Sequence, residues 1–262
     1  MNRIELRGHP VALHEYGPAD EDQPAWVLIH GGGHDPEVWE SFATVFAASG
    51  ARVLVPALPA HGGSGGEALA DIDAMADWLQ ALLSQLALPS VQLCGHSMGS
   101  LIALATAAAE PDRVARLVLI GSCAPMPVSD FVLDAARQDP PRAWELINKF
   151  SFAPAEVLGA ERRLALEQRN LARMQRQGAA VLATDLAACN AWQGGLTAAR
   201  RVRCPSLILC GEFDRMTPAE AAHPLLDALA SANSAARLQV LAGSGHTMME
   251  EIPQQLIEAL RT

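Results

Sequence analysis

Three residues of the chain, Ser97, Asp214 and His246, have the types and the order required for nucleophilic acyl transfer. Ser97 is the centre of GHSMG, residues 95–99, which follows the apolar segment 91–94 and precedes an alanine-rich segment from 101 to about 109. A strand, a G-x-S-x-G turn and a helix in this order indicate a nucleophile elbow, because the flanking glycines let the strand and the helix pass closely. We therefore predict that Ser97 is the nucleophile.

A serine hydroxyl is a weak nucleophile at neutral pH, so it needs a base and a group that orients the base. His246 follows an expected strand, residues 238–241, and a loop of small residues, which makes it the candidate base. Asp214 ends the loop GEFD after the apolar segment 206–210 and is the candidate for orienting the imidazole. The chain order Ser, Asp, His differs from the order in both common serine protease folds.

A glycine-rich segment, HGGG at residues 30–33, follows the apolar segment 26–29, and Trp39 lies nine residues beyond its histidine. With these motifs the chain resembles the α/β-hydrolases that carry a lid, a family that includes carboxylesterases, lactonases, C–C bond hydrolases and cofactor-free haloperoxidases. The resemblance extends from about Ile4 to the last expected helix. It implies an oxyanion hole formed by the backbone N–H groups of Gly32 and Met98, and removing one such donor typically costs on the order of 10² to 10³ in rate.

The order of apolar segments predicts an α/β fold. Residues 4–7 and 11–14 are expected to form an antiparallel hairpin, and strands alternate with helices after it. The resemblance implies a mostly parallel, eight-stranded sheet with helices on both faces. Between residues 124 and 200 the strands vanish, prolines appear and helical periodicity continues, so we expect a helical lid inserted after strand 6. The core then comprises residues 1–123 and 201–262, and the carboxyl edge of its sheet carries the three candidate residues.

Apolar side chains of the lid and of the motif regions are candidates for the substrate pocket. We select Trp39, Met126, Trp144, Trp192, Met216 and Met248. Arginines of the lid could hold a substrate carboxylate, but they alternate with glutamates, which favours a solvated helix face. They are Arg137, Arg142, Arg162, Arg163, Arg169, Arg173 and Arg176. His61, in the glycine-rich loop 58–66, is interpreted as a turn residue.

The composition narrows the classes of partner. A formal net charge of −10, from 19 basic and 29 acidic residues, argues against binding of nucleic acids or anionic membranes. The first residues lack the apolar segment of a signal peptide, and no stretch approaches the roughly 18 apolar residues of a membrane span. Five scattered cysteines favour neither a disulfide framework nor a zinc site. We therefore expect a cytoplasmic enzyme without metal or organic cofactor that acts on a small ester-like molecule.

The function that these residues predict best is a serine hydrolase of the carboxylic-ester type, which cleaves small or medium esters through an acyl-enzyme on Ser97. A lactonase or C–C bond hydrolase would use the same three residues, and an arginine or asparagine facing Ser97 would favour it. A ligand-binding or perception protein that retains a hydrolase fold is the alternative outside enzymes, because a fold does not fix a function.

Overall fold

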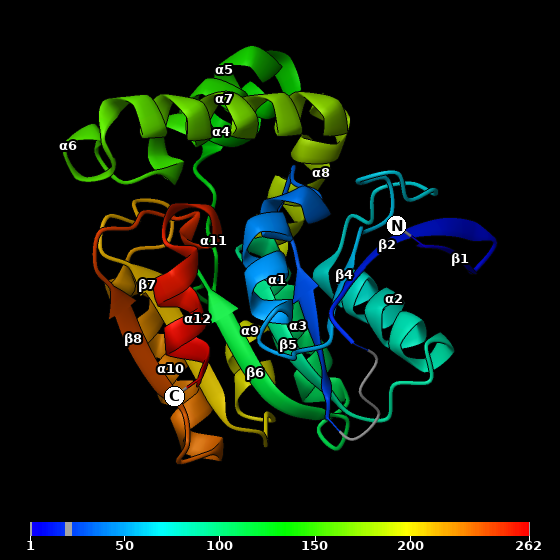
Figure 1. Ribbon diagram of the computed structural model, residues 1–262. Coiled ribbons are helices and arrows are strands. Elements are labelled where there is room, and N and C mark those ends of the chain that lie inside the picture. The colour runs from blue at the N-terminus through cyan, green and yellow to red at the C-terminus, as the bar shows by residue number, and fades with distance from the viewer. Residues whose placement is uncertain (1, 19–22, 262) are drawn as a thin grey trace.

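The computed structural model describes residues 2–18 and 23–261, with the backbone alone for residues 2 and 3. Its described part contains one eight-stranded sheet in the order β1-β2-β4-β3-β5-β6-β7-β8 (Figure 1). The strands are β1 (Asn2–Leu6), β2 (His9–Tyr16), β3 (Ala25–Ile29), β4 (Val53–Pro56), β5 (Val91–His96), β6 (Val114–Ile120), β7 (Ser206–Gly211) and β8 (Arg237–Leu241). Only β1 with β2 and β2 with β4 pair antiparallel, so the prediction of a mostly parallel, eight-stranded sheet is confirmed.

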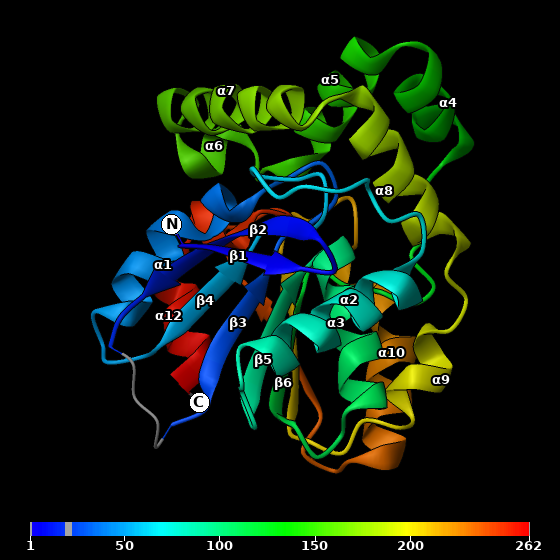
Figure 2. The same cartoon turned by 90° about the vertical axis from the view of Figure 1, so that its right-hand side faces the viewer.

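Helices cover both faces of the sheet, as Figure 2 shows from the side. One face carries α1 (Glu40–Ala47), α11 (Met248–Glu251) and α12 (Pro253–Arg261), and the short 3-10 helix η1 (Pro36–Trp39) leads into α1. The other face carries α2 (Ile72–Gln85), α3 (Met98–Ala109), α9 (Gly195–Ala199) and α10 (Ala219–Ala232). Every residue of β3 and of β7 is buried, because strands covered on both faces must be apolar throughout rather than alternating.

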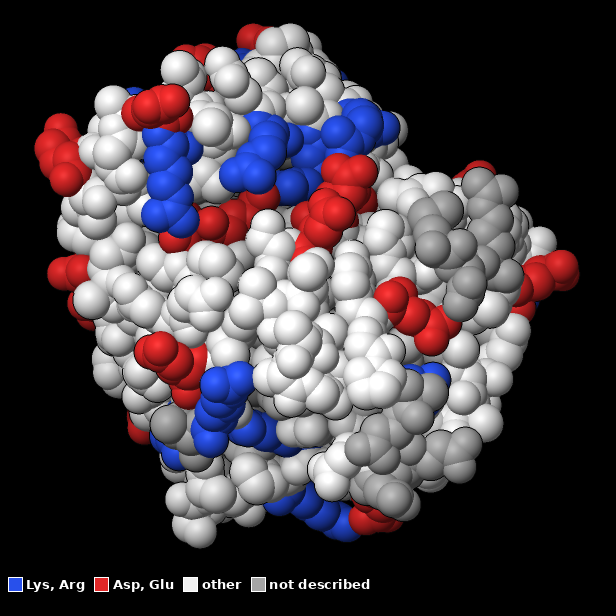
Figure 3. All heavy atoms as spheres, in the orientation of Figure 1, with Lys and Arg blue, Asp and Glu red and all other residues white. Residues whose placement is uncertain are grey.

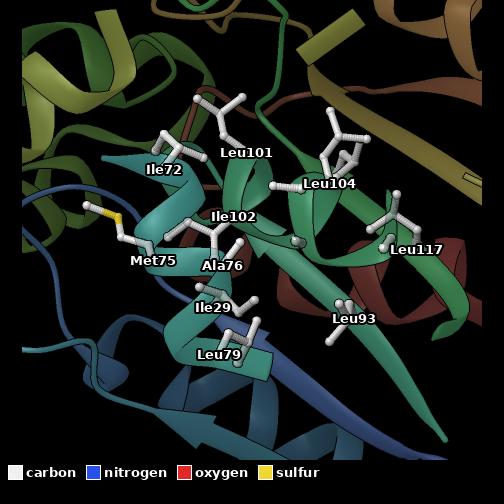
Figure 4. Packing of buried hydrophobic residues seen from close by; sticks show 14 of the residues in the cluster. Ile29, Ile72, Met75, Ala76, Leu79, Leu93, Leu101, Ile102, Leu104 and Leu117 are labelled. Carbon is white, nitrogen blue, oxygen red and sulfur yellow. The ribbon is translucent and has the colours of Figure 1, made fainter. Parts of the chain in front are cut away.

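The larger hydrophobic core lies between the sheet and the helices α2 and α3. Figure 4 shows Ile102 of α3 and Leu79 of α2 packed with Ile29 and Leu93 of the strands β3 and β5. Nearly all of α3 is buried, and its small alanines let the helix lie close to the sheet. This close packing matters for function because α3 begins directly after Ser97.

The chain between β6 and β7 forms helices and no strand. These helices are α4 (Asp130–Gln138), α5 (Pro140–Ser151), α6 (Ala155–Leu158), α7 (Ala160–Gln177), α8 (Ala179–Ala191) and α9. Helices α4 to α7 lie above the carboxyl edge of the sheet, α8 runs from them toward the body, and α9 packs against α3 and α10 (Figures 1 and 2). The expected helical content of this segment is observed, whereas its division from the core at residues 124 and 200 stays a prediction.

Local sequence explains where the helices above the sheet begin and end. Asp139 accepts a hydrogen bond from the N–H of Arg142, and Pro140 occupies the first turn of α5, where a missing N–H costs nothing. Gly159 and Gly178 adopt φ values of 84° and 91°, which only glycine adopts readily, and they bound α7 at its two ends. Among the described helices, none is both long and apolar enough to cross a membrane.

Candidate active site

Ser97 occupies a strained turn between β5 and α3. Its φ and ψ angles are 53° and −122°, outside the regions that residues with a side chain normally adopt. A Cβ atom on Gly95 would lie 2.1 Å from the carbonyl oxygen of Gly99, and one on Gly99 would lie 2.4 Å from that of Ile29. Neither contact is sterically possible, so the crossing of strand and helix requires both glycines of the G-x-S-x-G turn.

Asp214 and His246 lie side by side at the carboxyl ends of β7 and β8. Nδ1 of His246 lies 2.8 Å from Oδ2 of Asp214, and the Thr217 hydroxyl donates to the same oxygen at 2.8 Å. The N–H groups of Met216 and Thr217 donate to Oδ1, each at 2.9 Å. Burial alone would raise the pKa of Asp214, but the His246 ring and these hydrogen bonds outweigh it and hold that pKa below its ordinary value. Asp214 is therefore a carboxylate at neutral pH.

The loop that carries His246 is held from several sides. The N–H of His246 donates to the carbonyl oxygen of Ser151 at the end of α5, 2.8 Å away. The carbonyl of His246 accepts a hydrogen bond from Nε2 of His96 at 3.0 Å. A Cβ atom on Gly121, which has a φ of 57°, would lie 2.9 Å from the imidazole. The end of β6 therefore needs glycine to make room for His246, and an acid at that position would displace the ring.

A cavity of about 420 Å³ lies between the sheet edge and the helices above it, and it brings the predicted groups together. Ser97, His246, Gly32 and Met98 all line it. Nε2 of His246 is buried and has no hydrogen-bond partner among the described residues. Because Nδ1 faces Asp214, this second nitrogen is the one left to accept a proton. Apolar side chains form most of the remaining wall, among them Val132, Leu146, Ile147, Phe150 and Leu186.

The HGGG segment places its second peptide group beside Ser97. Burial lowers the pKa of His30 to about 3, so its ring is neutral. Nε2 of this ring accepts a hydrogen bond from the N–H of Leu58 at 3.2 Å. Nδ1 lies 2.9 Å from the carbonyl oxygen of Gly31. That carbonyl belongs to the same peptide group as the N–H of Gly32, whose orientation is thereby fixed. A Cβ atom on Gly31 would lie 3.2 Å from Cβ of Ser97, so the loop approaches the serine closely.

The two predicted oxyanion donors are free to serve a ligand. No hydrogen bond joins the N–H of Gly32 to another described residue, and Met98 stands in the first turn of α3, where N–H groups lack an acceptor within the helix. Both residues line the cavity with Ser97.

Two of the six selected pocket residues, Met126 and Met216, line the cavity. The other four lie elsewhere. Trp39 and Met248 are fully buried in the core around α1, α11 and α12, and Trp192 packs in the opposite core with its N–H donating to Asp73 at 3.1 Å. Trp144 packs among the helices above the sheet. These four side chains pack against other buried residues instead of lining the cavity.

None of the seven arginines named above the sheet lines the cavity, and four of them pair with acidic side chains. Arg142 pairs with Glu145, Arg163 with Glu167, and Arg176 with Asp35 and Glu37. Figure 3 shows basic and acidic side chains next to one another on one face of the molecule, where these helices meet the body. The expectation of an exposed, paired helix face agrees with the contacts of Arg142 and Arg176. It is wrong for Arg173, whose side chain is 5% exposed and pairs with Glu250 at 3.0 Å.

The sequence does not indicate Arg215, His34 or Asp185 as residues of the site. Arg215 lines the cavity beside Asp214, with its guanidinium 4.8 Å from the ring centre of Phe150, and His34 lines it from the HGGG side. Asp185 of α8 is fully buried and binds His61, which the sequence indicated only as a turn residue. Arg215 could have been found from its place at a strand end, whereas an aspartate in an alanine-rich helix gives no such signal.

This fold and the residues gathered at the edge of its sheet define a hydrolase architecture. The chain belongs to the alpha/beta hydrolase family, whose model matches residues 26–259. It is 33% identical over 237 residues to a pimeloyl-[acyl-carrier protein] methyl ester esterase of Aromatoleum aromaticum, with 82% of this chain and 89% of the relative covered.

Two further proteins are similar to this chain, one in sequence and one in fold. An (E)-2-((N-methylformamido)methylene)succinate hydrolase of Acinetobacter baylyi is 28% identical over 218 residues, covering 78% of each chain. The enol-lactonase of Burkholderia xenovorans LB400 superposes with a TM-score of 0.85 at 18% identity, over 99% of this chain and 98% of the other. The latter likeness concerns the fold.

Proposed function

We propose that the protein hydrolyses small or medium carboxylic esters through an acyl-enzyme on Ser97. The observation that carries the proposal is the bond of 2.8 Å between His246 Nδ1 and Asp214 Oδ2, in a cavity that Ser97 also lines. It orients the imidazole so that Nε2 is available as a base. The esterase names of relatives support the same reaction class.

In the first half of the reaction, Nε2 of His246 accepts the proton of the Ser97 hydroxyl as its oxygen attacks the ester carbonyl. The negative charge that develops on the carbonyl oxygen is stabilised by the N–H groups of Gly32 and Met98. Asp214 stabilises the imidazolium without taking up its proton. The tetrahedral intermediate collapses as His246 donates this proton to the leaving alkoxide, and an acyl-enzyme and an alcohol result.

In the second half, His246 accepts a proton from a water molecule that attacks the acyl carbonyl. The same two N–H groups stabilise the second oxyanion. Collapse of that intermediate breaks the bond to Ser97, and His246 returns the proton to the serine oxygen. The products are a carboxylic acid and the regenerated enzyme, so atoms and charge balance over the cycle.

Arg215 favours a second substrate class, molecules that carry an anionic group. Arg215 is the charged side chain that lines the cavity, and no ion pair with another described residue neutralises it. A guanidinium at the wall of a mostly apolar cavity favours substrates that carry an anionic group in addition to the scissile carbonyl. Lactones or C–C bonds next to a carbonyl in acidic molecules would suit the same arrangement, and a hydrolase of a succinate derivative is among the relatives.

The test compares wild type with Ser97→Ala on p-nitrophenyl esters from acetate to decanoate. We expect turnover by the wild type and a loss on the order of 10³ or more in the variant. The dependence on chain length then measures the usable depth of the cavity. Equal rates for the two proteins would refute Ser97 as the nucleophile, and tight ligand retention without turnover would favour the perception alternative.

A further inference from the structure

A buried carboxylate on α8 contacts the loop that would bind the oxyanion. Asp185 has no exposed surface, and its Oδ2 accepts a hydrogen bond of 2.7 Å from the N–H of Gly33. Gly33 follows Gly32 directly, so this bond fixes the peptide group on one side of the predicted oxyanion donor. The bond to the Gly31 carbonyl fixes the peptide group on its other side.

His61 supplies the second partner of the same oxygen. Its Nε2 lies 2.9 Å from Oδ2 of Asp185, and its Nδ1 lies 2.8 Å from the carbonyl of Pro59. The Pro59 carbonyl is an acceptor, and an ionised Asp185 is one too, so both ring nitrogens then carry hydrogen and the ring is an imidazolium. Asp185 and His61 therefore form an ion pair, 0% and 1% exposed, that joins α8 to the loop after β4.

The backbone of the HGGG loop is shaped to receive α8. A Cβ atom on Gly32 would lie 3.1 Å from Cβ of Asp185, and one on Gly33 would lie 2.8 Å from a methyl group of Leu182, one turn earlier on α8. These contacts leave no room between helix and loop. Because α8 belongs to the segment above the sheet, movement of that segment away from the core would remove the bond to Gly33.

We infer that Asp185 is a positioning residue for the oxyanion loop, with His61 holding its carboxylate, and that α8 must be seated on the core for catalysis. The inference rests on the proposed function, since it assigns the support of Gly32 in that reaction. The helical segment then contributes more than a wall of the cavity, because it holds a backbone donor needed in the transition state.

Two substitutions of Asp185 distinguish the effect of its hydrogen-bond acceptor from the effect of its negative charge. Asp185→Ala removes both oxygens, whereas Asp185→Asn keeps one oxygen that can accept from Gly33 and His61. The matched control is Asp134→Ala, which removes an exposed carboxylate from α4 of the same segment. Each variant is measured for kcat and KM, for binding of a trifluoromethyl ketone that forms an oxyanion on Ser97, and for binding of an unreactive ether of equal length.

For Asp185→Ala we expect kcat to fall about 10- to 100-fold, with KM within about threefold of wild type, because the donor acts in the transition state. Affinity for the ketone should fall by a similar factor, while affinity for the ether stays unchanged. Asp185→Asn should recover most of kcat, and Asp134→Ala should match wild type. A merely structural role would not weaken the ketone selectively.

The inference is overturned if folded Asp185→Ala keeps wild-type kcat, or if affinities for ketone and ether fall together. Should circular dichroism show that Asp185→Ala does not fold, Asp185→Asn and His61→Gln carry the test. We then expect a selective loss of ketone affinity in His61→Gln, and wild-type ketone affinity in that variant would refute the inference. Undiminished turnover by Ser97→Ala would instead refute the proposed function, so the two failures are distinguishable.

Discussion

Oδ2 of Asp214 lies 2.8 Å from Nδ1 of His246, and both side chains are almost completely buried. An ionised, acceptor-only carboxylate at this place requires hydrogen on Nδ1 and leaves Nε2 bare. The pair therefore selects one tautomer of the imidazole, which is the tautomer that a general base for Ser97 needs.

Replacing Asp214 by asparagine removes this selection, because an amide can equally donate to Nδ1 and favour the wrong tautomer. We expect kcat to fall on the order of 10⁴ for Asp214→Asn, as in other Ser-His-Asp sites. The control is Glu212→Gln in the same loop, whose exposed carboxylate bonds the N–H of Gly243 at 2.9 Å. Steady-state kinetics on one p-nitrophenyl ester measures both, and equal losses in the two variants would contradict the assignment.

Gly121→Ala should disable the site by displacing the His246 ring, since the added Cβ would lie 2.9 Å from it. The matched control is Gly50→Ala, because Gly50 also has a positive φ but nothing within 4 Å of the added atom. Both variants should lose roughly 1–2 kcal/mol of stability from backbone strain. We expect only Gly121→Ala to lose more than tenfold in kcat. Similar activities for the two variants at similar stabilities would rule out this steric account.

The ion pair of His61 with Asp185 should make stability depend on pH. Burial opposes the charge on His61, but the hydrogen bond and charge of Asp185, the Pro59 carbonyl and the charge of Asp35 together raise its pKa above 6.5. The neighbouring His30 is neutral, as its pKa of about 3 requires. Because the folded-state pKa is raised, the stabilisation is complete below about pH 6.5 and is lost as the pH rises through the folded-state value.

The measurement is the free energy of unfolding in urea for wild type and His61→Gln between pH 5.5 and 9, a range chosen around the pKa of about 6.5 for free histidine. We expect the difference between the two proteins to be largest at the acidic end and to shrink as the pH rises. A difference that is constant over this range would show that His61 stabilises the loop as a neutral side chain.

Arg215 should discriminate between substrates by charge. Its guanidinium stacks on Phe150 at the cavity wall, where a distal carboxylate of the substrate could pair with it. We expect Arg215→Gln to raise KM for the monomethyl ester of a dicarboxylic acid about three- to tenfold, a modest change because the side chain is exposed. KM for the neutral methyl ester of similar length should stay the same. Arg142→Gln, outside the cavity, is the control, and parallel changes for both esters would contradict the prediction.

Much of the fold follows from the sequence because its signals are local. The buried strands are continuous apolar runs. The turn around Ser97 requires Gly95 and Gly99, because a side chain at either position would collide with the backbone. Since parallel strands align their carboxyl ends, a position after β7 and one after β8 suffice to bring Asp214 and His246 to one edge.

The contacts that depend on three-dimensional packing could not be predicted in the same way. The distance of Trp39 from the HGGG motif predicts a pocket residue, but η1 turns its side chain into the core, where it packs against Phe42. Asp185 is one carboxylate in an alanine-rich helix, and its partners Gly33 and His61 are 152 and 124 residues away. Only the seating of α8 on the sheet edge brings these groups together.

The most direct test of the central claim is to locate the covalent adduct that a fluorophosphonate forms with the protein. We predict one adduct per chain, which peptide mass spectrometry maps to Ser97. No adduct should form in Ser97→Ala, and the rate of labelling should be much lower in His246→Ala. An adduct on another residue, or labelling of Ser97→Ala at the wild-type rate, would contradict the account.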